Sequence, residues 1–248
     1  MNSLVIERAD AVLRVKLNRP QCANALNDAM VDALVGVLEG ESAVSETRAL
    51  VIEGSGKNFC GGFDLADIEL LSDGDITLRF LRIESLLQRL YHAPYLTIAC
   101  AQGSAVGAGA DIFTACDYRI AAPGAGFRMP GWQFGIALGT RRLCDRIGSQ
   151  TARDLLATSR TLTADAALEC SFATHVVQPE SWPSSIEAIV RESATTSISA
   201  LAELHKVTAA DHRAADMAAL VTSALQPPSL KVRLLAYVAS AQAKASAK

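Results

Sequence analysis

Hydrophobic and polar residues follow two different periods along the chain, and each period predicts a kind of element. Residues 11–17 are apolar at every second position, which predicts a strand with one exposed face. Residues 49–52 and 96–100 form short, almost entirely apolar runs, which indicate buried strands. Residues 118–121 and 174–177 predict two further short strands.

Apolar residues at helical spacing separate several of these strands. They predict a helix over residues 30–38 that begins near Asn27 and Asp28. A second predicted helix covers residues 76–90 and stops before Pro94, because the residue before a proline is biased away from helical geometry. Strands that alternate with helices are typical of an α/β protein.

The C-terminal part of the chain has a different pattern. From Ser149 onward it is mostly helical, with Ser149 and Thr163 as the expected N-cap residues. From about residue 198 it predicts two or three amphipathic helices and little strand. We therefore predict a core over residues 1–190 and a helical region over residues 191–248.

Composition excludes several classes of protein. The chain has 248 residues, is 50% hydrophobic and carries a net charge of −3, so nothing favours a nucleic acid or an anionic membrane as partner. No apolar stretch approaches the roughly 20 residues that span a bilayer. The start lacks a basic segment followed by an apolar block, and the six cysteines include no pair with the two-residue gap of a zinc or redox motif. These features predict a cytoplasmic protein with free thiols and no metal.

Two glycine-rich loops carry the chemical signal. They occupy residues 54–65 and 102–111, and each follows a predicted buried strand. A glycine loop that opens a helix leaves backbone N–H groups pointing outward at the positive helix end, where they can hold a phosphate or a developing oxyanion. The alternative is a pair of tight turns without a ligand.

Three familiar glycine motifs do not fit these loops. In a dinucleotide fingerprint the third glycine would fall at Ile112, and no acidic residue occurs between Asp117 and Asp145. No G-K-[ST] follows the glycines, which excludes a P-loop. The G-x-S-x-G elbow of serine hydrolases is absent around Ser55 and Ser104.

Four segments, taken in order, resemble one known family. They are L-N-R-P and N-A-L within residues 17–26, G-K-N-F-C-G-G-F-D-L at 56–65, A-Q-G-S-A-V-G-A-G at 101–109 and C-D-Y-R-I-A at 116–121. On these motifs the chain is similar to the crotonase superfamily, also called the enoyl-CoA hydratase/isomerase family.

The resemblance implies both a fold and a ligand. The fold would be an α/β spiral of ββα repeats with a C-terminal helical trimerisation region, assembled as a homotrimer or as a hexamer made of two trimers. The ligand would be an acyl-CoA thioester, with coenzyme A as part of the substrate and no other cofactor. The enolate of the thioester would be stabilised by an oxyanion hole made of backbone N–H groups.

The resemblance also assigns roles to individual residues. The two oxyanion-hole donors would be the N–H groups of Phe63 and Ala108. The residues expected to contact the CoA or the substrate are Lys57, Asp64, Leu65, Ala66 and Trp132.

The chain departs from the family pattern at the acid/base positions. A hydratase of this family uses two glutamates; the first position falls on Asp111, which keeps a carboxylate, and the second falls on Gly131, which has none. Residues 135–143 form a loop about three residues shorter than is usual in the family. The leading hypothesis is an enoyl-CoA hydratase/isomerase-like enzyme with Asp111 as its only acid/base. The alternative is a degenerate, non-catalytic acyl-CoA binder or a structural member of the family.

Overall fold

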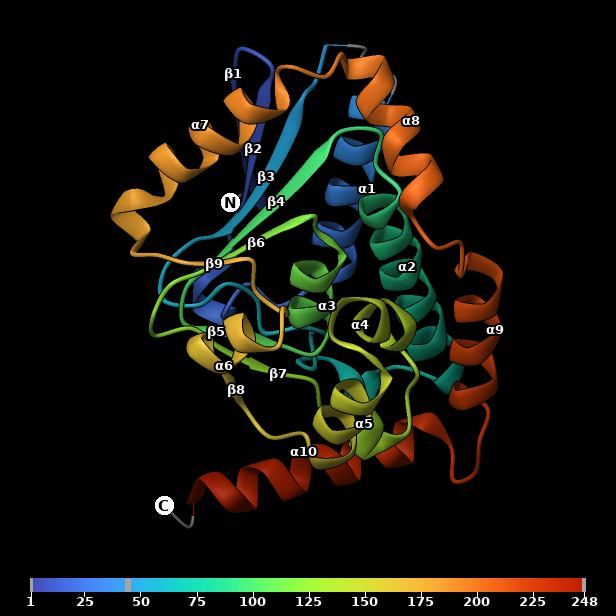
Figure 1. The fold of residues 1–248 in the computed structure, drawn as a ribbon. Coiled ribbons are helices and arrows are strands. Elements are labelled where there is room, and N and C mark those ends of the chain that lie inside the picture. Colours follow the sequence, from blue (N-terminus) through green and yellow to red (C-terminus); the bar gives the residue numbers. More distant parts are fainter. Residues whose placement is uncertain (1, 43–45, 247–248) are drawn as a thin grey trace.

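The computed structural model describes residues 2–42 and 46–246 as a mixed α/β fold. A six-stranded sheet has the order β1-β2-β3-β4-β6-β9, in which β1 and β2 are antiparallel and the other neighbours are parallel (Figure 1). Its strands are β1 (Leu4–Ala9), β2 (Val12–Leu17), β3 (Ala49–Gly54), β4 (Leu96–Ala101), β6 (Tyr118–Ala121) and β9 (His175–Val176).

A second sheet is small and lies next to the glycine-rich loops. Its order is β5-β7-β8, with β5 at Ser104–Val106, β7 at Gly126–Arg128 and β8 at Leu162–Thr163. An isolated bridge joins Cys60 to Ala105, so the first glycine-rich loop runs beside β5. The two loops are therefore fastened to one another by backbone pairing.

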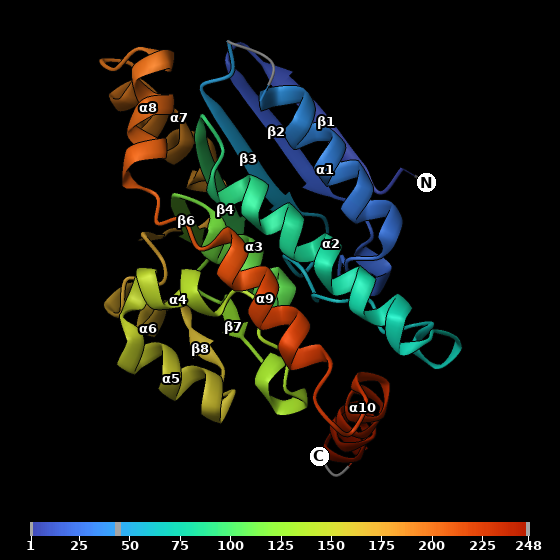
Figure 2. The ribbon, with the colours of Figure 1, turned by 90° about the vertical axis from the view of Figure 1, so that its right-hand side faces the viewer.

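Helices cover the large sheet and extend beyond it. In Figure 2, α1 and α2 lie side by side and α9 runs next to α2, while α10 lies across one end of the molecule. The helices are α1 (Asp28–Ser42), α2 (Asp73–Tyr91), α3 (Ala108–Ala115), α4 (Thr140–Ile147), α5 (Ser149–Thr158), α6 (Ala164–Glu169), α7 (Trp182–Ser193), α8 (Ile198–Thr208), α9 (Arg213–Ala224) and α10 (Leu230–Ser246). Short 3₁₀ turns are η1 (Pro20–Cys22), η2 (Ile68–Leu70), η3 (Gly131–Phe134) and η4 (Pro179–Ser181).

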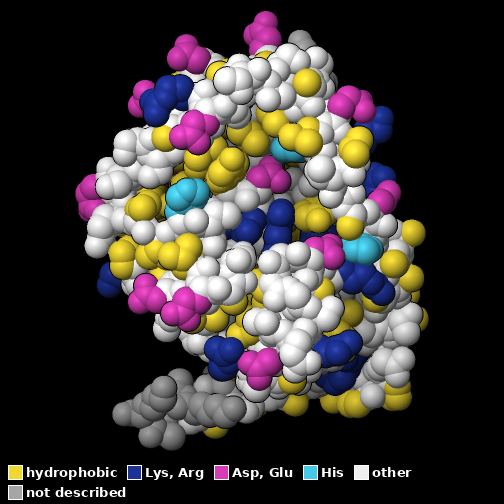
Figure 3. Space-filling view, in the orientation of Figure 1, with side chains coloured by type: hydrophobic (Ala, Val, Ile, Leu, Met, Phe, Trp, Pro, Cys, Tyr) yellow, Lys and Arg dark blue, Asp and Glu magenta, His cyan; other side chains and the backbone are white. Residues whose placement is uncertain are grey.

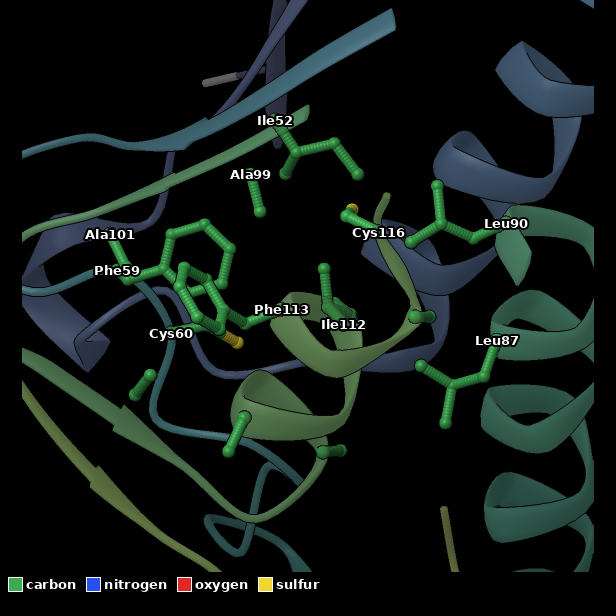
Figure 4. Packing of buried hydrophobic residues seen from close by; sticks show 14 of the residues in the cluster. Ile52, Phe59, Cys60, Leu87, Leu90, Ala99, Ala101, Ile112, Phe113 and Cys116 are labelled. Carbon is green, nitrogen blue, oxygen red and sulfur yellow. The ribbon is translucent and has the colours of Figure 1, made fainter. Parts of the chain in front are cut away.

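Helix α3 is buried along its whole length. Figure 4 shows Ile112 of α3 between Ile52 and Ala99 of the sheet and Leu87 of α2, and Phe113 next to Phe59. A Cβ atom on Gly109 would lie 2.3 Å from the carbonyl oxygen of Cys60, so only glycine permits α3 to approach the first loop this closely. The N-terminus of α3 is consequently held in a fixed place by the core.

Most predicted elements are present. The side-chain oxygen of Asn27 accepts a hydrogen bond from Met30 N at the start of α1, and Thr163 caps α6 by accepting one from Ala166 N. Helix α2 ends at Tyr91, before Pro94. The predicted cap Ser149 is wrong: Gly148, with φ of 78°, is the N-cap, and Ser149 is the first residue of α5.

Four strands were not predicted: β1, β5, β7 and β8, of which the last three are at most three residues long. Residues 103–109 were expected to form a loop, but β5 lies inside this segment, where its pairing with β7 stabilises a strand too short to have a period. Strand β1 has one buried residue followed by five exposed ones, so it shows no alternation and is held by pairing with β2.

The C-terminal region is helical, as the sequence predicts. From residue 198 to residue 246 the described chain forms α8, α9 and α10 and no strand. The boundary at residue 190 falls inside α7 and stays a prediction. Among the described residues, no helix has both the length and the apolarity to cross a membrane. On the face in Figure 3, acidic and basic side chains are interspersed.

Candidate active site

A pocket opens where the two glycine-rich loops meet α3, η3 and α10. It holds about 640 Å³ of empty space, its open mouth included. Apart from Asp111, its lining is mostly apolar or aromatic: Gly61, Phe63, Leu65, Phe80, Val106, Gly107, Ala108, Met129, Pro130, Gly131, Trp132, Phe134, Ile136, Leu138, Leu156, Leu234 and Tyr237. A concave, apolar pocket with few polar groups is the usual form of a small-molecule site.

The two predicted donors, Phe63 and Ala108, both line this pocket. Gly62 precedes Phe63 with φ of +85°, and a Cβ atom on it would lie 2.3 Å from Val106 O and 3.2 Å from Ala108 N. The first loop therefore touches the N-terminus of α3. Among the described residues, no hydrogen bond uses the N–H of Phe63 or of Ala108. Both N–H groups are available to a ligand oxygen in the pocket.

The geometry around these donors favours a negative charge. Ala108 is the first residue of α3, after the N-cap Gly107 with φ of 51°. The positive end of the α3 dipole thus faces the pocket. The Phe63 ring stacks on Phe80 with 4.4 Å between ring centroids, which fixes the position of the first loop.

Asp111 lies in the first turn of α3 and is 8% exposed. Its carboxylate has no hydrogen-bond partner among the described residues. A Cβ atom on Gly139 would lie 2.1 Å from Asp111 Oδ1, so the carboxyl packs directly on that glycine. Burial raises the pKa of Asp111 to about 8; the positive charge of Arg142 opposes this rise and the negative charge of Glu84 adds to it.

Asp111 supplies the only carboxylate in the described pocket lining, and Tyr237 is its only other ionisable residue. Gly131, at the position of the second expected acid, also lines the pocket. A Cβ atom on Gly131 would lie 3.2 Å from Ile136 O, so a side chain there would need the short loop to shift. The described residues contain no group of three or more His, Cys, Asp or Glu that could hold a metal ion.

A buried ion cluster lies behind Asp111. Arg142 of α4 makes a two-pronged contact with Glu84 of α2, at 2.5 and 2.9 Å, and a third contact of 3.2 Å with Asp216 of α9. Arg141 contacts the other oxygen of Asp216 at 2.8 Å. The cluster fastens α9 to α2 and to α4, the helix whose N-cap Gly139 supports Asp111. The sequence analysis did not identify this cluster. A usable signal was the charged residue Glu84, which lies next to Ile83 and one helical turn before Leu87, among the apolar positions of the predicted helix.

Comparison with known proteins gives the same picture as the motifs and the fold. A family profile described as enoyl-CoA hydratase/isomerase matches residues 7–225. The chain belongs to the enoyl-CoA hydratase/isomerase family. As the crotonase resemblance implies, this is a family of lyases and isomerases.

Individual relatives agree with this membership. The chain is 34% identical over 177 residues to a probable enoyl-CoA hydratase of Mycobacterium leprae, covering 69% of this chain and 70% of the relative. It is 36% identical over 182 residues to the mouse mitochondrial Delta(3,5)-Delta(2,4)-dienoyl-CoA isomerase, covering 67% and 56%. The crystal structure of a Bordetella parapertussis member of the family superposes with a TM-score of 0.93 and 41% identity, covering 96% of this chain and 99% of the other.

The structure places the other predicted binding residues in different environments. Leu65 and Trp132 line the pocket, and the Trp132 ring N–H donates to Thr140 Oγ1 at 3.2 Å. Lys57 and Ala66 are exposed outside the lining. Their contacts with CoA stay predictions.

Asp64 has a structural partner. Its carboxylate pairs with Arg19 at 2.7 Å and accepts the N–H of Ala66 at 3.1 Å, and it is 8% exposed. Arg19 also donates to the carbonyl oxygen of Ala25 at 2.6 Å. Asp64 therefore ties the first glycine-rich loop to the L-N-R-P segment.

The ion cluster yields a prediction about stability. Arg142→Met should lower the free energy of unfolding by about 3–5 kcal/mol, because it leaves Glu84 buried without its cation and removes one of the two arginines that pair with Asp216. Urea denaturation measures the change. Arg160→Met removes an exposed pair with Asp154 and should cost less than about 1 kcal/mol. Equal losses in the two variants would contradict the role given to the cluster.

Proposed function

We propose that this family member is an acyl-CoA isomerase that moves a proton with one carboxylate, Asp111, while the N–H groups of Phe63 and Ala108 stabilise the enolate. The observation that carries the proposal is that Asp111 is the only carboxylate in the described pocket lining. A hydratase of this family needs two acid/base groups, and Gly131 supplies none.

One carboxylate suffices to shift a double bond. In a 3-enoyl thioester the carboxylate of Asp111 removes a proton from C2, and the C–H electron pair moves into a dienolate whose charge rests on the thioester oxygen. The two N–H donors stabilise that charge. The protonated Asp111 then returns the proton at C4, which leaves the 2-enoyl thioester and restores the carboxylate. No water is consumed, so no second base is required.

The CoA part of the substrate would follow the first loop. We propose that the Lys57 ammonium meets a CoA phosphate, that Leu65 and Ala66 contact the pantetheine, and that Asp64 acts by holding the loop through Arg19. We also propose that no other cofactor is needed and that the chain assembles as a homotrimer or as a hexamer of two trimers.

The test is turnover with matched substrates. A 3-enoyl-CoA should be converted into the 2-enoyl isomer, while hydration of the same 2-enoyl-CoA should be much slower. Only the deprotonated carboxyl can remove a proton, so kcat/KM should rise with pH and level off above about pH 8, where Asp111 titrates. Faster hydration than isomerisation would contradict the proposal.

The absence of an acid at Gly131 also favours a second candidate, a non-catalytic acyl-CoA binder. Exchange of the α-proton of a saturated acyl-CoA in heavy water separates the two. Exchange that disappears in Asp111→Asn supports the enzyme. Tight binding of the thioester without any exchange would support the binder.

A further inference from the structure

Helix α10 crosses the pocket of its own chain. Figures 1 and 2 show it lying across one end of the molecule, and its residues Leu234 and Tyr237 line the pocket. The Tyr237 ring lies 5.2 Å from that of Phe134 in η3, measured between centroids, and Leu234 is 1% exposed. Part of the pocket wall therefore comes from the C-terminal helix.

Arg233, directly before Leu234, holds the helix in place. Its guanidinium donates to five backbone carbonyl oxygens. Two belong to η3 and the residue after it, two to the C-terminal end of α9 and one to the turn before α10. They are Phe134 at 2.6 Å, Gly135 at 3.0 Å, Ser223 at 2.8 Å, Ala224 at 3.0 Å and Pro228 at 2.9 Å. These bonds occupy all the N–H donors of the side chain. No carboxylate among the described residues pairs with Arg233.

The beginning of α10 is also fastened to η2 and to the start of α2. Lys231 Nζ donates to the carbonyl oxygens of Glu69 at 2.8 Å and Leu71 at 2.7 Å, and the Lys231 N–H donates to Asp73 at 2.7 Å. Arg233 and Lys231 thus join α10 to η3 and to the start of α2. The helix that carries Leu234 and Tyr237 is therefore held in place by contacts with several other elements of the chain.

The described lining of the pocket offers no cation to pair with a negatively charged group on the substrate. Among the described lining residues there is no Lys, Arg or His, and Phe80, Phe134 and Leu234 make its surface apolar. A carboxylate at the far end of an acyl chain would be buried there without a cation, which is strongly unfavourable. An apolar chain would instead gain free energy from each buried methylene.

We propose that α10 is the end wall of the acyl pocket, that Leu234 and Tyr237 set the longest apolar, uncharged acyl group that fits, and that Arg233 is the positioning residue for this wall. The proposal rests on the proposed function only in taking an acyl-CoA as the ligand. It requires no turnover.

Equilibrium binding of butanoyl-, octanoyl-, dodecanoyl- and adipoyl-CoA tests the wall. Tyr237→Ala and Leu234→Ala should each raise the affinity for dodecanoyl-CoA relative to butanoyl-CoA by roughly tenfold, because they lengthen the space available. Val232→Ala changes an exposed residue of the same helix and should leave this ratio unchanged. Adipoyl-CoA should bind more weakly than octanoyl-CoA to every variant.

Arg233→Met and Arg233→Lys test the positioning role. A residue that only stabilised the fold would lower the melting temperature and leave the chain-length ratio unchanged. Positioning predicts a reduced discrimination between dodecanoyl- and butanoyl-CoA in Arg233→Met, restored in part by the three donors of Arg233→Lys. If Arg233→Met fails to fold, the Tyr237→Ala and Leu234→Ala variants still test whether α10 limits the length of the acyl group.

The outcomes separate the two proposals. If folded Tyr237→Ala and Leu234→Ala keep the same ratio of affinities for dodecanoyl- and butanoyl-CoA, only the proposal that α10 is the end wall is overturned. Binding with the expected ratio but without turnover would overturn only the catalytic proposal. If none of the acyl-CoA probes binds, both proposals are overturned.

Discussion

Replacement of Asp111 by Asn should lower turnover by roughly 10²–10⁴-fold, the usual contribution of a general acid/base. The amide keeps the size of the carboxyl group, so it still fits against Gly139, where a Cβ atom would lie 2.1 Å from Asp111 Oδ1. It cannot take up or return a proton. Because the oxyanion donors and the apolar pocket are untouched, the affinity for acyl-CoA should stay nearly unchanged. Steady-state kinetics and equilibrium binding on the same preparation measure the two effects.

The same variant should be more stable than the parent at alkaline pH. Burial raises the pKa of Asp111 from its ordinary value of 3.8 to about 8, so between these values the folded protein keeps a proton that the unfolded chain has lost. Stability linked to this group therefore falls as the pH rises from about 4 to about 8. Asn carries no such cost, and Asp111→Asn should gain at least about 1 kcal/mol at pH 8.

Urea denaturation at pH 5 and pH 8 measures this gain, which should be larger at pH 8. Asp154→Asn changes an exposed carboxylate on α5 and is the matched control; it should keep its activity and show no comparable gain in stability at pH 8. A variant that lost turnover but became less stable at pH 8 would indicate that Asp111 is a structural anion. Full turnover in Asp111→Asn would remove it from the mechanism.

The parts of the site that the sequence predicted are those fixed by local patterns. Strands β3 and β4 are apolar runs that end in glycine-rich loops, and neighbouring parallel strands deliver such loops to the same edge of a sheet. The family motifs alone predicted that Phe63 and Ala108 share one site, and both residues line the pocket.

The parts that the sequence did not predict depend on contacts between distant segments. Asp111 lies against Gly139 only because α4 follows the short loop after η3, and no periodicity encodes that path. Glu84 and Asp216 meet Arg142 from different helices, so their pairing has no signature within any one of them. Arg233 binds carbonyl oxygens, which every residue has, and sequence cannot say which ones.

These distant contacts have one thing in common: they orient the groups whose identity the motifs supply. The proposed oxyanion donors are backbone N–H groups, so any sequence that closes the two loops can provide them. Two features distinguish the described pocket of this chain. Burial makes Asp111, the only carboxylate in its lining, a weak acid, and α10 contributes apolar side chains to its wall. The reaction proposed here follows from that environment and not from family membership alone.

Replacement of Ala108 by Pro should lower kcat/KM by roughly 10²–10³-fold, the usual cost of losing one oxyanion-hole donor. Proline is favoured at the first position of a helix, so the change removes the N–H of Ala108 while α3 still forms. Gly107, before it, has no Cβ atom to collide with the proline ring. The loss should appear mainly in kcat, because the oxyanion develops in the transition state.

Ser149→Pro is the matched control for this variant. Ser149 is also the first residue of a helix, α5, and it too follows a glycine N-cap with positive φ, Gly148 at 78°. It is exposed and does not line the pocket. Circular dichroism should show that both variants fold, and kinetics should show a loss in Ala108→Pro alone. Equal activity in the two variants would mean that the thioester oxygen does not lie at the N-terminus of α3, and the site would then need a different orientation of the substrate.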